Sequence, residues 1–459
     1  MRLKRRQFIQ SLAALTLPAS ANIGHAATAR SLVADGNRLL DLPEDFSYRI
    51  VSKVGSRMDD GLYVPPKHDG MAAFAGDRGR VILVCNHEMP PSHTEYSAFG
   101  DDFTSLPETL KARVYDAGGG RTPGVGGTTT TVYDPATART ERQHLSLAGT
   151  EINCAGGPTP WGSWLSCEEC FEDPGEGVSN GKAVVRERRH GYVFEVPARA
   201  SGLVAPEPLR DMGRFEHEAC AVHAETGIVY MTEDRHHSLF YRYIPEVPGE
   251  LGKGGRLQAL ALEDAPSFKT HNWSDEHPLP LNAALAVRWI DLEDVDPDRN
   301  DLRKRGVAAG AASFARGEGL CVTDDGVAFT CTIGGPDRLG QIFTYTPGTF
   351  EGRAEESREP GRLTLIAEAG RDSLLRHADN ITMAPWGDLF VCEDTSDHCG
   401  IVGVRPNGEQ YPVADNAYTD SELAGVCFSP DGQTLFVNIQ NPGTTFAITG
   451  PWQRLAGRA

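Results

Sequence analysis

The sequence predicts an all-β protein in which hairpins are arranged around a central axis, as in a β-propeller. Glycine and proline account for 50 and 30 of the 459 residues, are spread evenly along the chain, and no long helical pattern occurs. This composition is typical of strands joined by many tight turns. A glycine turn followed by about six strand-forming residues also recurs six times. The recurrence indicates six copies of one hairpin unit.

The turn of each hairpin can be placed from its glycine. The glycines stand directly before the predicted second strands, at Gly79, Gly162, Gly227, Gly326, Gly387 and Gly432. Most of them follow residues that favour turns, as in the segment Ser429-Pro430-Asp431-Gly432. Each turn is therefore expected to join two antiparallel strands.

Acidic residues recur at matching positions of these hairpins. One second strand is followed by Glu88, and three others end in pairs of acids, Glu168-Glu169, Glu233-Asp234 and Glu393-Asp394. The first strands begin with an acid or a thiol, namely Asp69, Cys154, Glu218, Glu318, Asp379 and Glu422. The start of one strand lies beside the end of the next at the open end of a hairpin. In a radial arrangement all these side chains would meet near the central channel.

Carboxylates gathered in this way would repel one another unless cations neutralised them. A single acid at a strand end often marks only the exit of the chain to solvent. Recurrence at both matched positions of several hairpins favours a ligand role instead, and multivalent cations suit such oxygen ligands. The pattern therefore predicts a metal cluster at the central channel.

The overall charge limits the partners of the protein. The formal net charge is −19, although residues 1–26 contain four basic residues and no acid. An acidic surface repels nucleic acid and anionic membranes, so we expect no nucleic-acid partner. It would also repel a phosphorylated substrate unless bound cations reversed the potential locally.

The N-terminus has the pattern of a twin-arginine export signal. Arg5 and Arg6 precede Phe8, a mildly apolar stretch and an exit of small residues. We expect residues 1–29 to be this signal peptide and residues 30–459 to form a single domain. No later segment approaches the roughly 18 apolar residues of a membrane span, so no stable membrane insertion is expected. The predicted partner is the twin-arginine export machinery, and the predicted location is periplasmic or secreted.

Most of the ten cysteines lie in apolar, strand-like segments, where a thiol behaves as a small buried hydrophobic group. Cys167 and Cys170 have CxxC spacing, but no second CxxC accompanies them as a zinc ribbon would require. Cys154 is the exception, because it occupies the register position that an acid holds in the other hairpins. We expect a chemical role for Cys154 alone.

Several of these segments resemble the PhoX-type alkaline phosphatase family, whose members are exported by the twin-arginine route. The matching segments are 151–169, 213–219, 314–319, 379–387 and 428–452, of which Asn153-Cys154-Ala155-Gly156-Gly157 is among the most specific. The resemblance implies a six-bladed β-propeller that holds iron and calcium in one cluster. It also implies hydrolysis of phosphomonoesters, with a metal-bound oxo or hydroxide group as the nucleophile.

The resemblance also assigns roles to individual residues. It implies that Arg316 contacts the substrate phosphate and that four residues bind metal: Cys154, Glu169, Glu218 and Glu318. The repeat pattern adds six further candidate ligands: Glu88, Glu233, Asp234, Asp379, Glu393 and Asp394. By strand alternation, Arg316 and Glu318 should point to the same face.

Two other functions fit parts of the pattern. A calcium-dependent propeller lactonase would need one central metal ion, and a non-catalytic binding propeller would need no buried acids. Metal analysis separates the three possibilities: iron with calcium supports the phosphatase, a single calcium supports the lactonase, and no metal supports the binding module.

Overall fold

The structure is a computed structural model that describes residues 31–100, 108–274, 276–396, 398–455 and 457. The predicted signal peptide lies outside these residues. In the described ranges the chain forms 27 strands and few helices. The α-helices are α2 (Glu108–Lys111), α3 (Leu302–Ala309) and α4 (Trp452–Leu455). The 3₁₀ helices are η1 (Asp77–Gly79), η2 (Gly118–Gly120), η3 (Arg210–Met212), η4 (Leu251–Lys253) and η5 (Glu356–Arg358). None of the helices in these ranges is long and apolar enough to cross a membrane.

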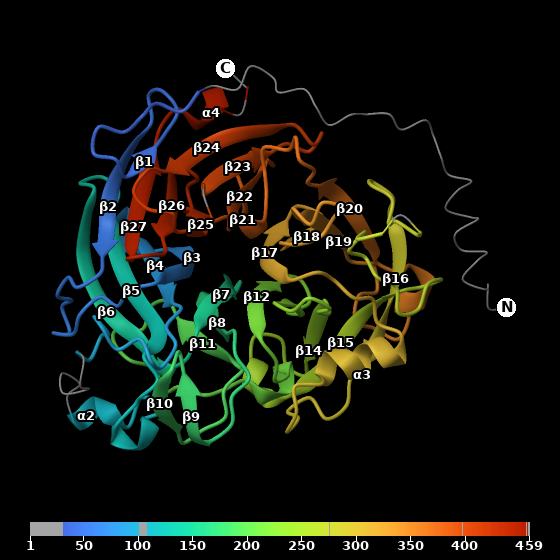
Figure 1. The fold of residues 1–459 in the computed structure, drawn as a ribbon, viewed down its shortest axis with the longest axis horizontal. Helices are drawn as coiled ribbons and strands as arrows, with labels where there is room; N and C mark the ends of the chain where they lie inside the picture. Colours follow the sequence, from blue (N-terminus) through green and yellow to red (C-terminus); the bar gives the residue numbers. More distant parts are fainter. Residues whose placement is uncertain (1–30, 101–107, 275, 397, 456, 458–459) are drawn as a thin grey trace.

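Sheets of antiparallel strands surround a central axis (Figure 1). The first sheet contains β3 (His68–Ala75), β4 (Val81–His87), β5 (Gly126–Asp134) and β6 (Arg139–Thr150). The second contains β7 (Asn153–Pro158), β8 (Ser163–Glu168) and β11 (Val193–Pro197). A separate ribbon follows β8 in the chain and consists of β9 (Gly175–Ser179) and β10 (Lys182–Arg186).

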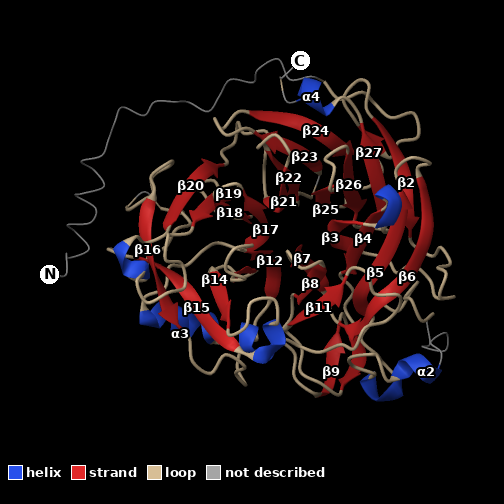
Figure 2. Ribbon diagram, turned by 180° about the vertical axis from the view of Figure 1, so that it is seen from behind, coloured by secondary structure: helices blue, strands red, loops and turns tan. Residues whose placement is uncertain are grey.

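A nine-stranded sheet forms the next part of the ring (Figure 2). Its first half is β12 (His217–Val222), β13 (Val229–Glu233), β14 (Tyr241–Pro245), β15 (Gly255–Leu262) and β16 (Leu285–Asp291). Its second half is β17 (Gly317–Thr323), β18 (Gly326–Cys331), β19 (Gln341–Thr346) and β20 (Arg362–Glu368). Only two register pairs between β16 and β20 join the halves. The sheet curls so that its edge strands β12 and β17 lie against each other.

Two further sheets complete the ring, and each takes one strand from the N-terminal part of the described chain. One contains β21 (Ala378–Met383), β22 (Leu389–Glu393), β23 (Gly400–Val404), β24 (Gln410–Asn416) and β1 (Leu40–Asp41). The other contains β25 (Leu423–Phe428), β26 (Thr434–Ile439), β27 (Thr444–Thr449) and β2 (Ser47–Lys53). Strand β2 pairs with β27 along its length, so N-terminal and C-terminal segments close the ring together.

Six inner strands line the axis, and each contacts its two neighbours around the ring: β3, β7, β12, β17, β21 and β25. Glycines allow these contacts. A Cβ atom on Gly70 in β3 would lie 2.5 Å from the Cα of Ala155 in β7, and one on Gly319 in β17 would lie 2.6 Å from the carbonyl oxygen of Asp379. A larger residue at either position would push the inner strands apart.

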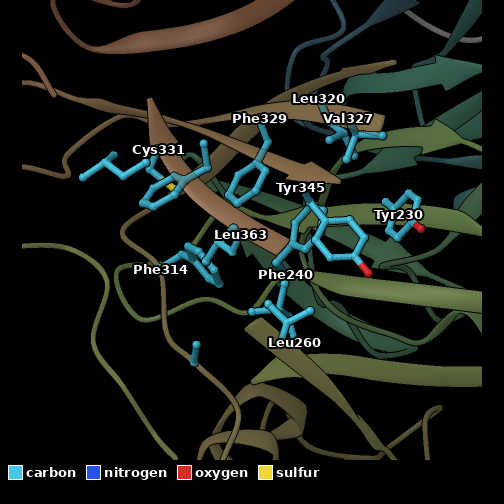
Figure 3. Packing of buried hydrophobic residues seen from close by; sticks show 14 of the residues in the cluster. Tyr230, Phe240, Leu260, Phe314, Leu320, Val327, Phe329, Cys331, Tyr345 and Leu363 are labelled. Carbon is cyan, nitrogen blue, oxygen red and sulfur yellow. The ribbon is translucent and has the colours of Figure 1, made fainter. Parts of the chain in front are cut away.

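An aromatic core fills the interior of the nine-stranded sheet (Figure 3). The ring centroids of Phe240 and Phe329 are 4.3 Å apart, and those of Phe329 and Phe343 are 5.2 Å apart, both in stacked geometry. Phe314 packs edge-on against Phe329 and Phe343. Since Phe314 is buried two residues before Arg316, this core anchors the segment that carries the arginine.

The predicted all-β, propeller-like fold is confirmed, and all six predicted hairpins form: β3–β4, β7–β8, β12–β13, β17–β18, β21–β22 and β25–β26. The sheets are not six separate units, however. Four stand alone around the ring, and the rest of the ring is the nine-stranded sheet. The physical reason is the added strand β16, whose edge is covered by pairing with β20 instead of facing solvent.

Candidate metal centre

A polar cavity of about 140 Å³ lies at the open ends of the six hairpins. Nine carboxylates, one thiol, one guanidinium and two amides line it. These groups belong to Asp69, Glu88, Cys154, Glu169, Glu218, Asp234, Arg316, Glu318, Asp379, Asn380, Asp394, Glu422 and Gln440. The cavity therefore draws residues from every hairpin of the ring.

A β-bulge in each first strand positions the buried ligands. In all six hairpins the pairing register shifts once, so that the first strand advances three residues while the second advances two. In five hairpins the first residue of the shifted segment lines the cavity: Asp69, Cys154, Glu218, Glu318 and Asp379. A bulge bends the strand and redirects a side chain, here into the cavity. In the sixth hairpin this position is Gly425, and Glu422, just before β25, supplies the acid.

Alternation along the second strands decides which acid of each pair lines the cavity. Glu169, Asp234 and Asp394 do so, as does Glu88 after β4. Adjacent residues of an extended chain point in opposite directions. Two of the sequence-predicted ligands, Glu233 and Glu393, therefore do not line the cavity.

The carboxylates of these two acids form hydrogen bonds outside the cavity. Glu233 accepts hydrogen bonds from the Tyr241 hydroxyl at 2.8 Å and from the Leu239 backbone N–H at 3.3 Å. Glu393 accepts one from the backbone N–H of Arg376 at 2.8 Å. Both carboxyls sit in the packing around the strand ends, where they support the loops beside the cavity.

Glu168 holds the same position in its hairpin as Glu233 and Glu393, because each is the last residue of a second strand. It is fully buried and accepts hydrogen bonds from the backbone N–H groups of Glu151 and Gly191. His190 lies with its Nδ1 2.6 Å from Oε1 of Glu168. Burial by itself would lower the pKa of His190, but Glu168, Asp116 and Glu151 outweigh it and raise the pKa to about 10. This cluster beside the cavity is therefore an ion-pair network with its own cation.

Ligand atoms in the cavity fall into three groups, each within 4.8 Å. They are Cys154 with Glu169 and Glu218, Asp69 with Glu88 and Glu422, and Glu218 with Glu318 and Asp379. Glu218 belongs to two of these groups. The thiol of Cys154 donates a hydrogen bond to Oε2 of Glu218 at 2.8 Å.

The electrostatics of the cavity favour cations. Burial, followed by the neighbouring carboxylates Asp234 and Glu88, raises the pKa of Glu169 well above its usual range. Burial and Asp394 raise the pKa of Asp379 to about 7. Burial, Glu218 and Glu169 raise the pKa of the Cys154 thiol. Each of these groups would ionise readily only with positive charge close by.

Arg316 is the guanidinium of the cavity. Its Nε and Nη2 donate to the two carboxylate oxygens of Asp234 at 2.8 and 2.7 Å, and Nη2 also lies 2.8 Å from Oε1 of Glu318. The residue precedes β17 and has a φ of 56°, a left-handed conformation uncommon for a non-glycine residue. Arg316 and Glu318 contact each other as the sequence prediction required, but not through strand alternation, because Arg316 lies before β17.

The sequence-based ligand set omitted Asp69, Glu422, Asn380 and Gln440. The two acids carried a usable signal: Asp69 occupies the same register as Glu218 and Asp379, and Glu422 lies at the start of its hairpin, just before β25. Gln440 carried less: its Nε2 donates to Asp69 Oδ2 at 2.9 Å and to Glu88 Oε2 at 2.8 Å. An amide that bridges two acids from another hairpin has no local sequence pattern.

A propeller-like fold with carboxylates, a thiol and an arginine in one central cavity defines a class of propeller proteins whose chemistry is gathered at the axis of the ring. Comparison with protein families shows to which family the chain belongs. The chain belongs to the alkaline phosphatase PhoX family, whose model matches residues 28–443. The protein is therefore a phosphatase that acts on phosphomonoesters.

A solved phosphatase structure agrees in fold. The structure of Pseudomonas fluorescens PhoX in complex with vanadate, a transition state analogue, superposes with a TM-score of 0.66 at 17% identity, covering 92% of this chain and 97% of that chain. A gluconolactonase from Xanthomonas campestris gives a TM-score of 0.35 at 12% identity, covering 88% of this chain and 95% of that chain. The second score is too low to carry any argument about fold or function. Comparison with curated proteins gives no match.

Proposed function

We propose that this chain hydrolyses phosphomonoesters in the central cavity with iron and calcium as cofactors. The observation that carries the proposal is the gathering of nine carboxylates and one thiol around Arg316 in a single cavity. A phosphoryl group in reaction needs charge neutralisation and positioning more than covalent help from the protein. An acidic cavity offers neither to a phosphate unless metal ions occupy it.

The donor set fits two kinds of metal ion. Cys154, Glu169 and Glu218 combine a thiolate with carboxylates, a set that suits iron. Asp69, Glu88 and Glu422 offer only oxygen atoms, which calcium prefers. Glu218, Glu318 and Asp379 also offer only oxygen, and Glu218 would link this group to the iron ligands.

In the proposed reaction the bound metal ions would neutralise the phosphate and activate the attacking oxygen nucleophile. Arg316 would bind a phosphate oxygen, since a guanidinium remains charged and cannot act as a metal ligand. Asp234 and Glu318 would hold the guanidinium in position through the contacts described above. The Pseudomonas fluorescens protein forms a complex with vanadate, a transition state analogue, which supports phosphoryl chemistry for this chain.

Elemental analysis of the purified protein, paired with a phosphomonoester assay, tests this proposal. We expect both iron and calcium in the active protein and loss of activity on chelation. An active protein that contains calcium alone, or no metal, would contradict the proposed cofactors.

We further propose that residues 30–459 form one six-bladed propeller, in which the nine-stranded sheet represents two blades joined through β16 and β20. The support is the ring of six inner strands and their six bulged hairpins. Proline in place of the partly exposed Ala286, which disrupts the backbone pairs Leu285–Leu363 and Ala286–Arg362, should leave a folded, active enzyme. Collapse of the whole fold would show instead that the nine strands are one unit.

We also propose export through the twin-arginine pathway to the periplasm or the exterior. Its support is the Arg5-Arg6 pair and the segment that follows. Replacing both arginines with lysine should keep the precursor in the cytoplasm. Normal export of this variant would contradict the proposal.

A further inference from the structure

A second cavity, of about 450 Å³, adjoins the central one. The two share Arg316 and Asp394 in their linings. Beyond these, the lining of the second cavity includes Arg376, His377, Thr395 and Ser396, together with the apolar Ile333 and Leu339. A phosphate held by Arg316 would therefore have this cavity next to it, in a place where the alcohol part of the ester can lie.

Arg376 brings an uncompensated positive charge to this cavity. Its side chain is exposed, and its Nη2 donates to the carbonyl oxygen of Arg371 at 3.1 Å. Among the described residues no carboxylate lies within ion-pair distance of its guanidinium, whereas Arg371 pairs with Asp337 at 3.2 Å. The charge of Arg376 is thus available to a ligand.

The acidic surroundings of Arg376 make its charge important for the choice of substrate. The protein has a net charge of −19, and the adjoining cavity holds nine carboxylates. A second anionic group on a substrate would be repelled unless a cation received it. A guanidinium receives carboxylate or phosphate oxygens through two parallel hydrogen bonds.

We propose that the second cavity binds the leaving group and that Arg376 binds an anionic substituent on it. The preferred substrates are then phosphomonoesters whose alcohol carries a second anionic group, such as a carboxylate. This inference rests on the proposed phosphatase reaction in the central cavity and adds the substrate class to it.

Two substrates of matched shape provide the test. 3-Phosphoglycerate and glycerol 3-phosphate differ only in having a carboxylate or a hydroxymethyl group at the far carbon. The metal-loaded wild type should show a kcat/KM about tenfold higher for 3-phosphoglycerate at low salt, the gain expected from one charge-assisted hydrogen-bonded pair. The preference should shrink as salt is raised.

Variants locate the effect. Arg376→Gln should reduce the ratio of the two kcat/KM values to about one, and Arg376→Glu should invert the preference. Arg371→Gln is the matched control on the same loop, and it should retain the wild-type ratio because Arg371 does not line the cavity. Lys304→Gln is a second control, since Lys304 lines a different basic cavity with Arg235 and Arg303.

The outcomes separate this inference from the reaction on which it rests. If neither ester is hydrolysed by the metal-loaded protein, the proposed reaction fails and the inference fails with it. If the esters are hydrolysed but the wild type does not prefer 3-phosphoglycerate, the inference alone is overturned. A preference that survives Arg376→Gln, or disappears in Lys304→Gln, also overturns it.

Discussion

Arg316 and Asp234 form a two-pronged ion pair, with Nε and Nη2 of the arginine 2.8 and 2.7 Å from the two oxygens of the carboxylate. The two residues come from neighbouring hairpins of the nine-stranded sheet. Nη2 is further occupied by Glu318. Within the described residues, the Nη1 protons therefore remain available to a phosphate oxygen. The pair with Asp234 fixes the plane of the guanidinium and so the direction in which these protons point.

Replacing Arg316 with lysine should therefore reduce activity strongly while metal binding persists. A lysine keeps the charge but cannot pair with Asp234 through two parallel bonds and also reach the phosphate. We expect kcat/KM to fall about 100-fold, the typical cost of one preorganised donor at a reacting oxyanion. Steady-state kinetics and elemental analysis of the same preparation measure both effects. Wild-type kinetics in the variant would assign Arg316 a purely structural role.

Glu168 and Glu169 are adjacent in sequence but should respond differently to the same change. Glu169→Gln should reduce the metal bound per chain, because Glu169 lines the cavity beside Cys154. Glu168→Gln should keep the metal but reduce the free energy of unfolding by about 1–3 kcal/mol, because a buried acceptor of several hydrogen bonds is weakened. Metal analysis and denaturant unfolding separate the two. If the Glu168 variant lost metal and the Glu169 variant did not, our assignment of the strand faces would be wrong.

Chelation should lower the melting temperature and reverse the direction in which the melting temperature changes with pH. Folding raises the pKa of Asp379 from 3.8 to about 7. A raised carboxyl pKa favours the folded state below pH 3.8, and this contribution is lost as pH rises through about 7. The metal-free protein should therefore melt at a higher temperature near pH 6 than near pH 8. The metal-loaded protein should show the opposite trend, because ligand carboxylates must lose their protons to bind.

Differential scanning calorimetry at both pH values, with and without chelator, measures this prediction. Reloading the chelated protein with iron and calcium should restore the higher melting temperature near pH 8, which controls for irreversible damage. An unchanged melting temperature after complete metal removal would show that the cluster does not hold the hairpins together.

The hairpins and most of the cavity residues could be predicted because their signals are local. A glycine turn at a fixed distance from an acid is visible within about ten residues of sequence, and six copies reinforce one another. The choice between Glu233 and Asp234 is different, because it depends on the direction in which each strand end points. The β3–β4 hairpin gave a clue, because it has one acid instead of two. That acid, Glu88, stands at the position that Asp234 holds in its own hairpin.

The merged sheet could not be predicted in the same way. Strand β16 pairs with β20, more than 70 residues later in the chain, through Leu285–Leu363 and Ala286–Arg362. Pairing at this separation depends on how the whole ring closes and leaves no local pattern. The contacts of Arg316 with Asp234 likewise join separate hairpins, so the sequence could predict the arginine but not its fixed orientation.

Cys154 provides the sharpest test of the proposed iron ligand set. Its thiol is buried and lies 2.8 Å from Glu218, and burial with the nearby acids raises its pKa. Cys154→Ser keeps the volume but replaces a soft thiolate with a hydroxyl that ionises poorly. We expect loss of iron and of phosphatase activity in a chain that still folds.

Cys331→Ser is the matched control, because Cys331 is a buried free thiol on the same ring that does not line the cavity. It stands opposite Gly317 at the register position that Glu233 and Glu393 hold in other hairpins. This variant should retain iron and activity, with a modest loss of stability at most. Iron content and visible absorbance of the two purified variants decide the matter. A full iron complement in Cys154→Ser would make Cys154 a structural thiol like the others, and the match in register with Glu218 and Glu318 would then have no bearing on metal binding.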